Sequence, residues 1–373
     1  MSPLASSLLR AAAAGLCAAG ADGILRSVGD RSRVVRGRGA PRWIGRASRP
    51  FQILIYHRVR PGPSPFAIDA MEPEWFERQM GHLARHYRVL PLEELGRLAR
   101  ERKIPPRAVA VTFDDGYADN LEYALPILRR WGLPATLFVV TGCIGTGIVP
   151  WHDRVLRAFE HTTRRELLLP GEESALALGT EIERRAAAFR ALALLKPLQE
   201  EARLERVARV GDALEVSREV TEAPGLMLDW EQVLALRRGG VAIGSHTVSH
   251  PILSRQAPER VWDELVESKR RIESAIGEPV TLFAYPNGRP EDYTPEVVSM
   301  VDRAGYRVGV TTSFGTNEAD DDPLRWRRGT PWEADLPRFA LKLAYYRFAG
   351  ESGPPRAATA PGTSGEGAGG SSG

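Results

Sequence analysis

One segment of the chain reads Val109-Ala110-Val111-Thr112-Phe113-Asp114-Asp115-Gly116-Tyr117. Its apolar, β-branched residues predict a buried strand that ends at two adjacent carboxylates and a glycine. Neighbouring aspartates repel each other, so a fold rarely places them at a strand end for stability alone. Because one carboxylate can bind a metal ion while the other transfers a proton, the segment indicates metal-assisted chemistry. Taken alone, the pair could also cap a helix or hold a structural cation.

A second segment supplies further metal ligands. It reads Gly244-Ser245-His246-Thr247-Val248-Ser249-His250-Pro251 and follows an apolar run at 241–243. Two histidines four residues apart are expected on one face of a helical turn, where both rings can reach one ion. With Asp115 they would form a two-histidine, one-carboxylate site with open positions. The histidines alone could instead be satisfied polar groups beside a loop.

Together the two segments resemble the polysaccharide deacetylase family, the NodB-homology domain. The resemblance rests on the run from Thr112 to Gly116 and the run from Ser245 to His250, and it covers roughly residues 50–330. It implies a distorted parallel (β/α)7 barrel and metal-dependent removal of acetyl groups from sugars. It also implies that Asp114 is the general base and that Asp115, His246 and His250 are the metal ligands.

A third motif of the family, Arg-x-Pro-Tyr, is only partly matched. The corresponding residues are Ala284-Tyr285-Pro286-Asn287. The family uses the backbone N–H at the Asn287 position to hold the oxyanion, and a backbone donor survives a change of side chain. The arginine that usually orients the base is replaced by Ala284, so the sequence does not show what orients Asp114.

The general acid also departs from the usual pattern. The family commonly places it in a late Leu-x-His motif, but this chain has no histidine after His250. The segment Ile53-Leu54-Ile55-Tyr56-His57-Arg58-Val59 instead places a histidine after an early strand. This resembles a permuted branch that includes poly-N-acetylglucosamine deacetylases. Because the first and last strands of a closed barrel are neighbours, His57 is assigned as the acid, although it could merely pack on Tyr56.

The resemblance extends to substrate and cofactor. Substrate contacts are assigned to four residues near the motifs: Tyr117, Trp151, Tyr285 and Pro286. Trp151 could stack on an apolar sugar face or equally anchor the core or a lid. Zinc is the expected metal for histidine and carboxylate ligands, and cobalt or nickel would satisfy the same site. The expected partner is an N-acetylated glycan.

The remaining apolar runs predict an alternating α/β fold. Strands are expected at 51–56, 108–113, 135–140, 241–245, 280–285 and 307–312, with a weaker one at 324–328, and helices at 73–87, 118–131, 258–276 and 294–304. This alternation favours a parallel sheet or barrel, with the candidate residues at the carboxyl ends of its strands. Residues 152–238 show no clear strand and predict a helical insertion that forms a lid, a groove wall or a remote scaffold.

Composition and the chain ends limit the other possibilities. The chain has 373 residues, 43% of them hydrophobic and 26% charged, as in ordinary globular proteins. A net charge of +3 without any nucleic-acid motif gives no reason to expect nucleic-acid binding. Residues 1–49 are basic and carry a weak signal-like or membrane-surface stretch, so cytoplasmic, membrane-peripheral and exported locations stay open. Residues 331–352 are expected to form a helix, packed on the barrel or at a membrane surface, and 353–373 to be disordered.

Three functions are compatible with these patterns. The first is a metal-dependent deacetylase acting on N-acetylated sugars. The second is a catalytically inactive glycan-binding domain, which the missing motif arginine and the displaced histidine would fit. The third is a two-histidine, one-carboxylate iron oxygenase, which the α/β alternation disfavours. Oligomeric state is left open.

Overall fold

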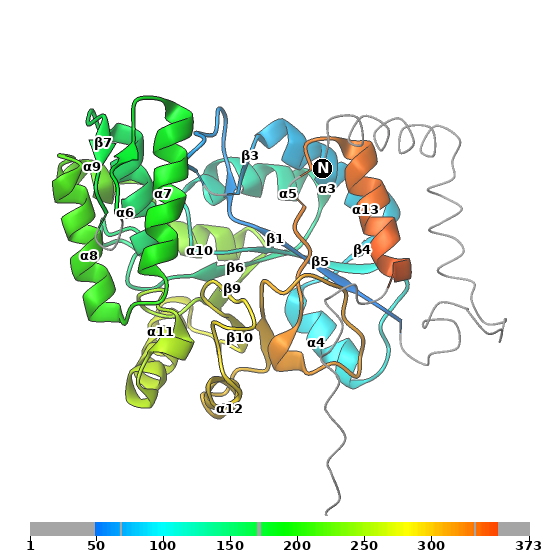
Figure 1. The fold of residues 1–373 in the computed structure, drawn as a ribbon. Coiled ribbons are helices and arrows are strands. Elements are labelled where there is room, and N and C mark those ends of the chain that lie inside the picture. Colours follow the sequence, from blue (N-terminus) through cyan, green and yellow to red (C-terminus); the bar gives the residue numbers. More distant parts are fainter. Residues whose placement is uncertain (1–48, 68, 170–172, 332, 350–373) are drawn as a thin grey trace, which may run out of the picture.

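The computed structural model describes residues 49–67, 69–169, 173–331 and 333–349 (Figure 1). The sequence predictions for residues 1–48 and for the 353–373 tail lie outside these residues. Within the described parts of the chain, no helix has both the length and the hydrophobicity needed to cross a membrane.

A curled sheet of parallel strands forms the centre of the molecule (Figure 1). The strands pair in the order β1, β5, β6, β9, β10, β11, and a short β4 pairs with β5. Every residue of β1, β5 and β6 is buried, as expected when both faces of a parallel sheet are covered. The six stronger predicted strands are confirmed. Their bounds, with β4, are β1 Gln52–Tyr56, β4 Arg88–Val89, β5 Ala108–Phe113, β6 Ala135–Val139, β9 Val241–Ser245, β10 Leu282–Ala284 and β11 Val308–Val310.

The segment after β11 connects the last strand to the first. Trp326 forms a parallel bridge with Val310, and Gly329 forms one with Leu54. The weaker strand predicted at 324–328 is therefore a 3₁₀ helix, η3 (Pro323–Arg325), followed by two isolated bridges. These bridges join the two edges of the curled sheet, and the fold is the predicted distorted parallel barrel.

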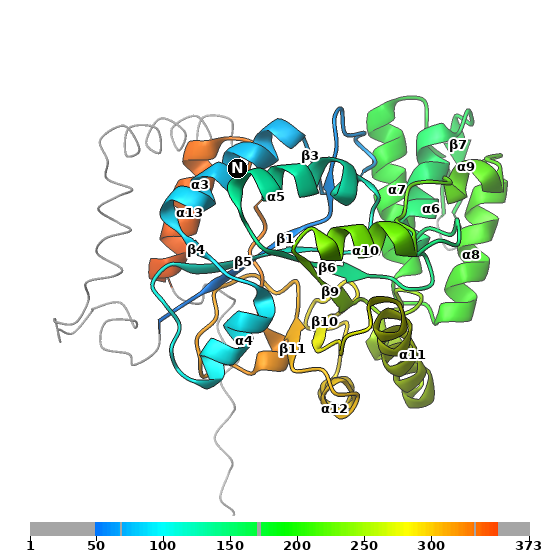
Figure 2. The same ribbon diagram turned by 180° about the vertical axis from the view of Figure 1, so that it is seen from behind.

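Helices cover the outside of the sheet (Figures 1 and 2). Three of the α-helices have proline as their first residue, where the missing N–H costs no hydrogen bond. The predicted C-terminal helix, α13, packs on the barrel core through Phe339 and Leu343. Helix bounds are α3 Pro73–His86, α4 Leu92–Arg100, the π-helix η1 Asn120–Ala124, α5 Leu125–Trp131, α10 Trp230–Arg238, η2 Leu253–Arg255, α11 Pro258–Ile276, α12 Pro295–Arg303 and α13 Leu336–Ala349.

The predicted insertion forms a separate helical block beside the barrel, drawn in green in Figure 1. It has its own hydrophobic core, which contains Trp151, Phe159 and Leu192. Two predictions about it are wrong: it contains a short antiparallel pair, β7 and β8, and α10 packs on the barrel core through Val233 and Leu236. Its elements are α6 Trp151–His161, β7 Glu166–Leu167, β8 Leu176–Ala177, α7 Glu181–Leu195, α8 Glu200–Ala213 and α9 Arg218–Glu222.

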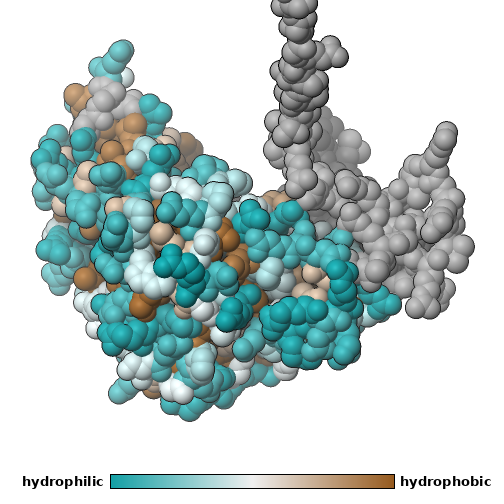
Figure 3. Space-filling view, turned by 90° about the horizontal axis from the view of Figure 1, so that it is seen from below, coloured by the Kyte–Doolittle hydropathy of each residue, from teal (hydrophilic) through white to brown (hydrophobic). Residues whose placement is uncertain are grey.

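The surface seen from below is mostly hydrophilic, and its hydrophobic residues occur in small groups (Figure 3). A second parallel pair, β2 (Arg58–Val59) and β3 (Ala70–Met71), lies between β1 and α3 in the chain. Strand β2 directly follows His57, and β3 directly follows Asp69. The pairing of the two strands therefore brings His57 and Asp69 close together.

Candidate active site

Asp114 directly follows β5 and is held by an arginine that the sequence analysis missed. Arg328 donates from Nη1 to Asp114 Oδ1 at 2.7 Å and from Nη2 to Oδ2 at 2.6 Å. Its Nε donates to the carbonyl of Thr311, and the side chain is fully buried. Burial by itself raises the pKa of Asp114, but Arg328 and then His246 outweigh it and hold the pKa below its usual value. Asp114 is therefore an oriented, ionised carboxylate.

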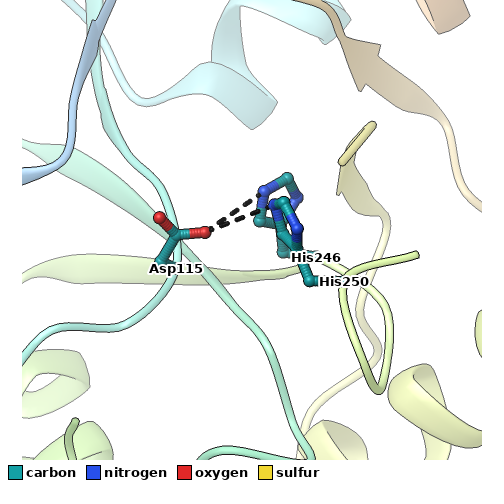
Figure 4. Close-up of side chains that lie close together, drawn as sticks. All are labelled: Asp115, His246 and His250. Atoms are coloured by element: carbon teal, nitrogen blue, oxygen red, sulfur yellow. Dashed lines mark ion pairs between the residues drawn. The ribbon is translucent and has the colours of Figure 1, made fainter. Parts of the chain in front are cut away.

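Asp115 faces the two histidines of the second motif (Figure 4). Its Oδ1 lies 3.6 Å from His246 Nε2 and 3.6 Å from His250 Nε2. All three side chains are buried, and Asp115 Oδ1 has no hydrogen-bond partner in the described residues. A buried, unpartnered carboxylate oxygen between two ring nitrogens is what a bound cation would satisfy. The donor set therefore fits a divalent metal ion.

The histidines are prepared to act as ligands. Nδ1 of His246 donates to the carbonyl of Ala284 at 2.7 Å, which leaves the lone pair on Nε2 facing Asp115. Burial lowers the pKa of His246 and lowers that of His250 well below its usual value. Both rings are thus held neutral, as metal binding requires.

The loop between the histidines is not the helical turn that their spacing predicted. Thr247 and His250 have φ values of 68° and 59°, outside the helical region. Glu264, on α11, holds this loop: its carboxylate accepts from Val248 N at 2.7 Å, Ser249 N at 3.0 Å and Ser249 Oγ at 2.7 Å. The glutamate is buried, so these bonds fix the loop and the direction of both rings.

Several residues of this site have a positive φ, a backbone conformation that is strained for residues other than glycine. Among the described non-glycine residues with positive φ are Asp115 at 74° and Asn287 at 60°, in addition to the two loop residues above. Such conformations persist only where the surrounding structure enforces them, and they cluster at functional sites. The four positions lie at the carboxyl ends of β5, β9 and β10, as the sequence analysis expected for an active site.

His57 lies on the same cavity, directly after β1. Its Nδ1 is 3.7 Å from Oδ2 of Asp69, and its backbone carbonyl accepts from Asn120 Nδ2 at 2.9 Å. The Asp69 carboxylate thus lies beside the ring, but His57 Nδ1 forms no hydrogen bond within the described residues. His57 and Asp114, the predicted acid and base, line the same cavity.

Asn287 is positioned by both of its amide atoms. Its Oδ1 accepts from Lys196 Nζ at 3.0 Å, and its Nδ2 donates to Asp292 Oδ2. Among the hydrogen bonds of the described residues, none uses the backbone N–H of Asn287. That donor remains available for an oxygen in the cavity.

These groups open into one cavity of about 550 Å³. It lies between the carboxyl ends of the strands and α7 of the insertion, so the insertion forms one wall of the substrate site. Among the described residues, those that line it include His57, Asp69, Asp114, Asp115, Tyr117, Trp151, His152, Phe189, Lys196, His246, His250, Asn287 and Arg289.

Two of the four residues predicted to contact substrate line the cavity. Tyr117 and Trp151 line the cavity but are 3% exposed, and Tyr117 donates to Asp153 Oδ2 at 2.7 Å, so both are mainly wall residues. The assignment of Tyr285 and Pro286 as substrate contacts is corrected, because both residues are buried and neither lines the cavity. Tyr285 packs against Phe283 in the core, which the motif alone could not reveal.

The sequence analysis missed or left unassigned two residues that line the cavity, His152 and Lys196, and one buried behind Asp114, Arg328. Arg328 lies in a segment predicted only as a weak strand, and no local pattern connects it to Asp114. His152 Nε2 lies 3.9 Å from Asp115 Oδ2, and Lys196 belongs to the insertion. Their placement depends on how the insertion and the closing segment fold against the barrel.

Comparison with known proteins agrees with this geometry. The family model described as polysaccharide deacetylase matches residues 101–309. YxkH of Bacillus subtilis, a polysaccharide deacetylase by name, is 24% identical over 270 residues, which are 72% of this chain and 66% of YxkH. The poly-β-1,6-N-acetyl-D-glucosamine N-deacetylase of Staphylococcus aureus is 38% identical over 71 residues, 19% of this chain and 24% of that protein. The chain thus spans less than two thirds of these relatives.

Solved structures share the fold. The deacetylase PplD of Streptococcus pyogenes, solved with acetate, superposes with a TM-score of 0.54 at 20% identity and covers 80% of this chain and 99% of PplD. IcaB of Ammonifex degensii gives a TM-score of 0.52 at 20% identity, with 79% and 97% covered. These likenesses independently support the barrel architecture.

Proposed function

The chain belongs to the polysaccharide deacetylase family, and we propose that it hydrolyses the acetyl groups of N-acetylated sugars in a glycan, with a bound divalent metal ion. One observation carries the proposal. An ionised base, Asp114, a ligand set built on Asp115 and a histidine, His57, all face a single cavity. The names of the relatives, which include a poly-N-acetylglucosamine deacetylase, support the choice of substrate class.

Each group has a distinct chemical task. A divalent ion held by Asp115, His246 and His250 would supply Lewis acidity to the attacking water and the acetyl carbonyl. Asp114 accepts the proton of that water, and Arg328 keeps its carboxylate ionised and aimed at the cavity.

Two further groups complete the reaction. The free backbone N–H of Asn287 donates to the carbonyl oxygen as negative charge develops there. His57, whose ring lies beside the Asp69 carboxylate, donates a proton to the departing sugar amine. Separate carboxylates are needed for the base and for the ligand set, because a carboxylate whose charge is committed to a cation is a poor proton acceptor.

We propose zinc as the ion, because neutral imidazole nitrogens and one carboxylate suit it, and cobalt or nickel would also fit this donor set. The alternative of an inactive glycan-binding domain loses one of its two supports, since Arg328 takes the place of the missing motif arginine. The residues proposed as metal ligands, base and acid all line one cavity, which supports a catalytic role.

The test measures acetate release from N-acetylglucosamine oligomers by protein loaded with zinc or cobalt. Release should require metal and fall by about 10²- to 10⁴-fold in Asp114→Asn, the usual contribution of a positioned base. Asp263→Asn, an exposed carboxylate on α11 outside the cavity, serves as the matched control and should keep full activity. Metal and glycan binding without acetate release would instead indicate a binding domain.

A further inference from the structure

Two positively charged side chains line the catalytic cavity in addition to the reacting groups. Lys196 directly follows α7 of the insertion, and Arg289 lies in the loop after β10. They come from different parts of the fold, and both face the same space as the metal ligands. Lys196 Nζ donates to Asn287, two residues before Arg289, and the pKa of Lys196 is lowered first by burial and then by the charge of Arg289.

Neither cation forms an ion pair in the described residues. Lys196 Nζ donates to the neutral amide oxygen of Asn287 at 3.0 Å. The acidic residues whose charges raise the pKa of Lys196 are Asp292 and Glu291. The Asp292 carboxylate is 8% exposed and accepts from the backbone N–H of Arg289 and from the Asn287 amide, so it is committed to the loop itself.

The other carboxylates of the cavity are also engaged. Asp114 is paired with Arg328, Asp115 faces the two ligand histidines, and Asp69 faces His57. The three account for every aspartate and glutamate that lines the cavity among the described residues. Lys196, which is half-buried, and Arg289, which is exposed, therefore face one cavity without an ion-pair partner among the described residues, and a bound anion would supply that partner.

We propose that Lys196 and Arg289 form a subsite for an anionic group, a phosphate or a carboxylate, carried by the glycan next to the acetylated sugar. This rests on the proposed function, and it narrows the substrate from glycans in general to acidic ones. The guanidinium and ammonium groups are the usual recognition groups for both anions.

The position of the subsite relative to the chemistry supports this assignment. Lys196 binds the side chain of Asn287, whose backbone N–H is the proposed oxyanion donor. An anion bound to Lys196 would therefore lie close to the acetyl carbonyl that Asn287 contacts, as expected for a group on the neighbouring sugar. Phe189, two helical turns before Lys196 on α7, also lines the cavity and is 44% exposed, which offers an apolar face for a sugar ring.

The experiment compares three substrates: a neutral N-acetylglucosamine oligosaccharide and the same oligosaccharide carrying a phosphate or a uronate carboxylate beside the acetylated sugar. The measured quantity is the ratio of kcat/KM for each anionic substrate to that for the neutral one. The wild-type ratio should be at least about 10, the value of one charge-assisted hydrogen bond, and should fall as salt is added. The larger of the two ratios identifies the anion.

Arg289→Gln and Lys196→Met should each bring the ratio close to one. Arg100→Gln, an equal loss of charge on α4 outside the cavity, should leave it unchanged. A wild-type ratio of one, or a ratio that survives in both cavity variants, would overturn the subsite while the deacetylase function stands.

A binding measurement separates the two proposals. Metal-loaded Asp114→Asn protein is titrated with the three oligosaccharides, with and without Arg289→Gln. Tighter binding of an anionic oligosaccharide that depends on Arg289 supports the subsite even if the wild-type protein releases no acetate, an outcome that would count against the reaction alone. Equal binding of all three, or none, counts against the subsite.

Discussion

Replacing Arg328 with methionine should strongly destabilise the protein, because it leaves the Asp114 carboxylate buried without its partner. Arg328 and Asp114 are 0% and 2% exposed, and two hydrogen bonds of 2.7 and 2.6 Å join them. Removing one partner of a buried ion pair lowers the free energy of unfolding by about 3–5 kcal/mol. The same change also frees the Thr311 carbonyl, which now accepts from Arg328 Nε.

Urea unfolding of wild type, Arg328→Met, Asp114→Asn and the double variant measures this directly. The double variant carries neither charge, so it should be more stable than the sum of the single effects predicts, by about 2 kcal/mol or more. Additivity within about 0.5 kcal/mol would show that the pair does not act as a unit and would refute the reasoning. Arg328→Lys, which keeps the charge but loses the fork geometry, should lie between wild type and Arg328→Met.

The pH dependence gives a second check on the same variant. In the wild type the pKa of Asp114 is lowered, so its contribution to stability is present above the unfolded value of about 3.9 and is lost as pH falls through the folded pKa. Without Arg328, burial is left to raise this pKa. In the variant, the free-energy cost of burying the unpaired Asp114 carboxylate is then present at high pH and is lost as the carboxyl protonates. The stability gap between Arg328→Met and wild type should therefore narrow from pH 8 to pH 5.5, and a gap that widens would contradict this account.

Three further predictions concern the metal loop, the ligands and the acid. Glu264→Gln weakens the acceptor for Val248 and Ser249, so zinc affinity measured by calorimetry should fall by about 10- to 100-fold, as for other groups that orient ligands. Chelation, or Asp115→Asn, should abolish acetate release, and added metal should restore it only in the chelated wild type. His57→Gln should lower kcat by about 10²- to 10⁴-fold with little effect on zinc binding; an unchanged kcat would remove His57 as the acid.

Much of the site followed from local patterns. Apolar runs that end in Asp114, His246 and His57 each predict a strand with a polar residue at its carboxyl end, and parallel strands bring those ends to one edge. The family resemblance supplied the roles of these residues. The expected helical turn between His246 and His250 was wrong, because spacing alone does not report a loop that a distant glutamate stabilises.

The chain's own sequence determined the order of strands and helices, the paired aspartates and the two-histidine segment, because these depend on residues close together in the chain. Only the tertiary structure decided which partners meet them. Arg328 is 214 residues from Asp114 and Lys196 is 91 residues from Asn287, and each pair forms only because the barrel closes and the insertion packs at its rim. The residues next to a charged side chain in the sequence do not show which distant residue will be its partner. The closed fold decides which charges are buried together, and those neighbours set the protonation state and orientation of the group.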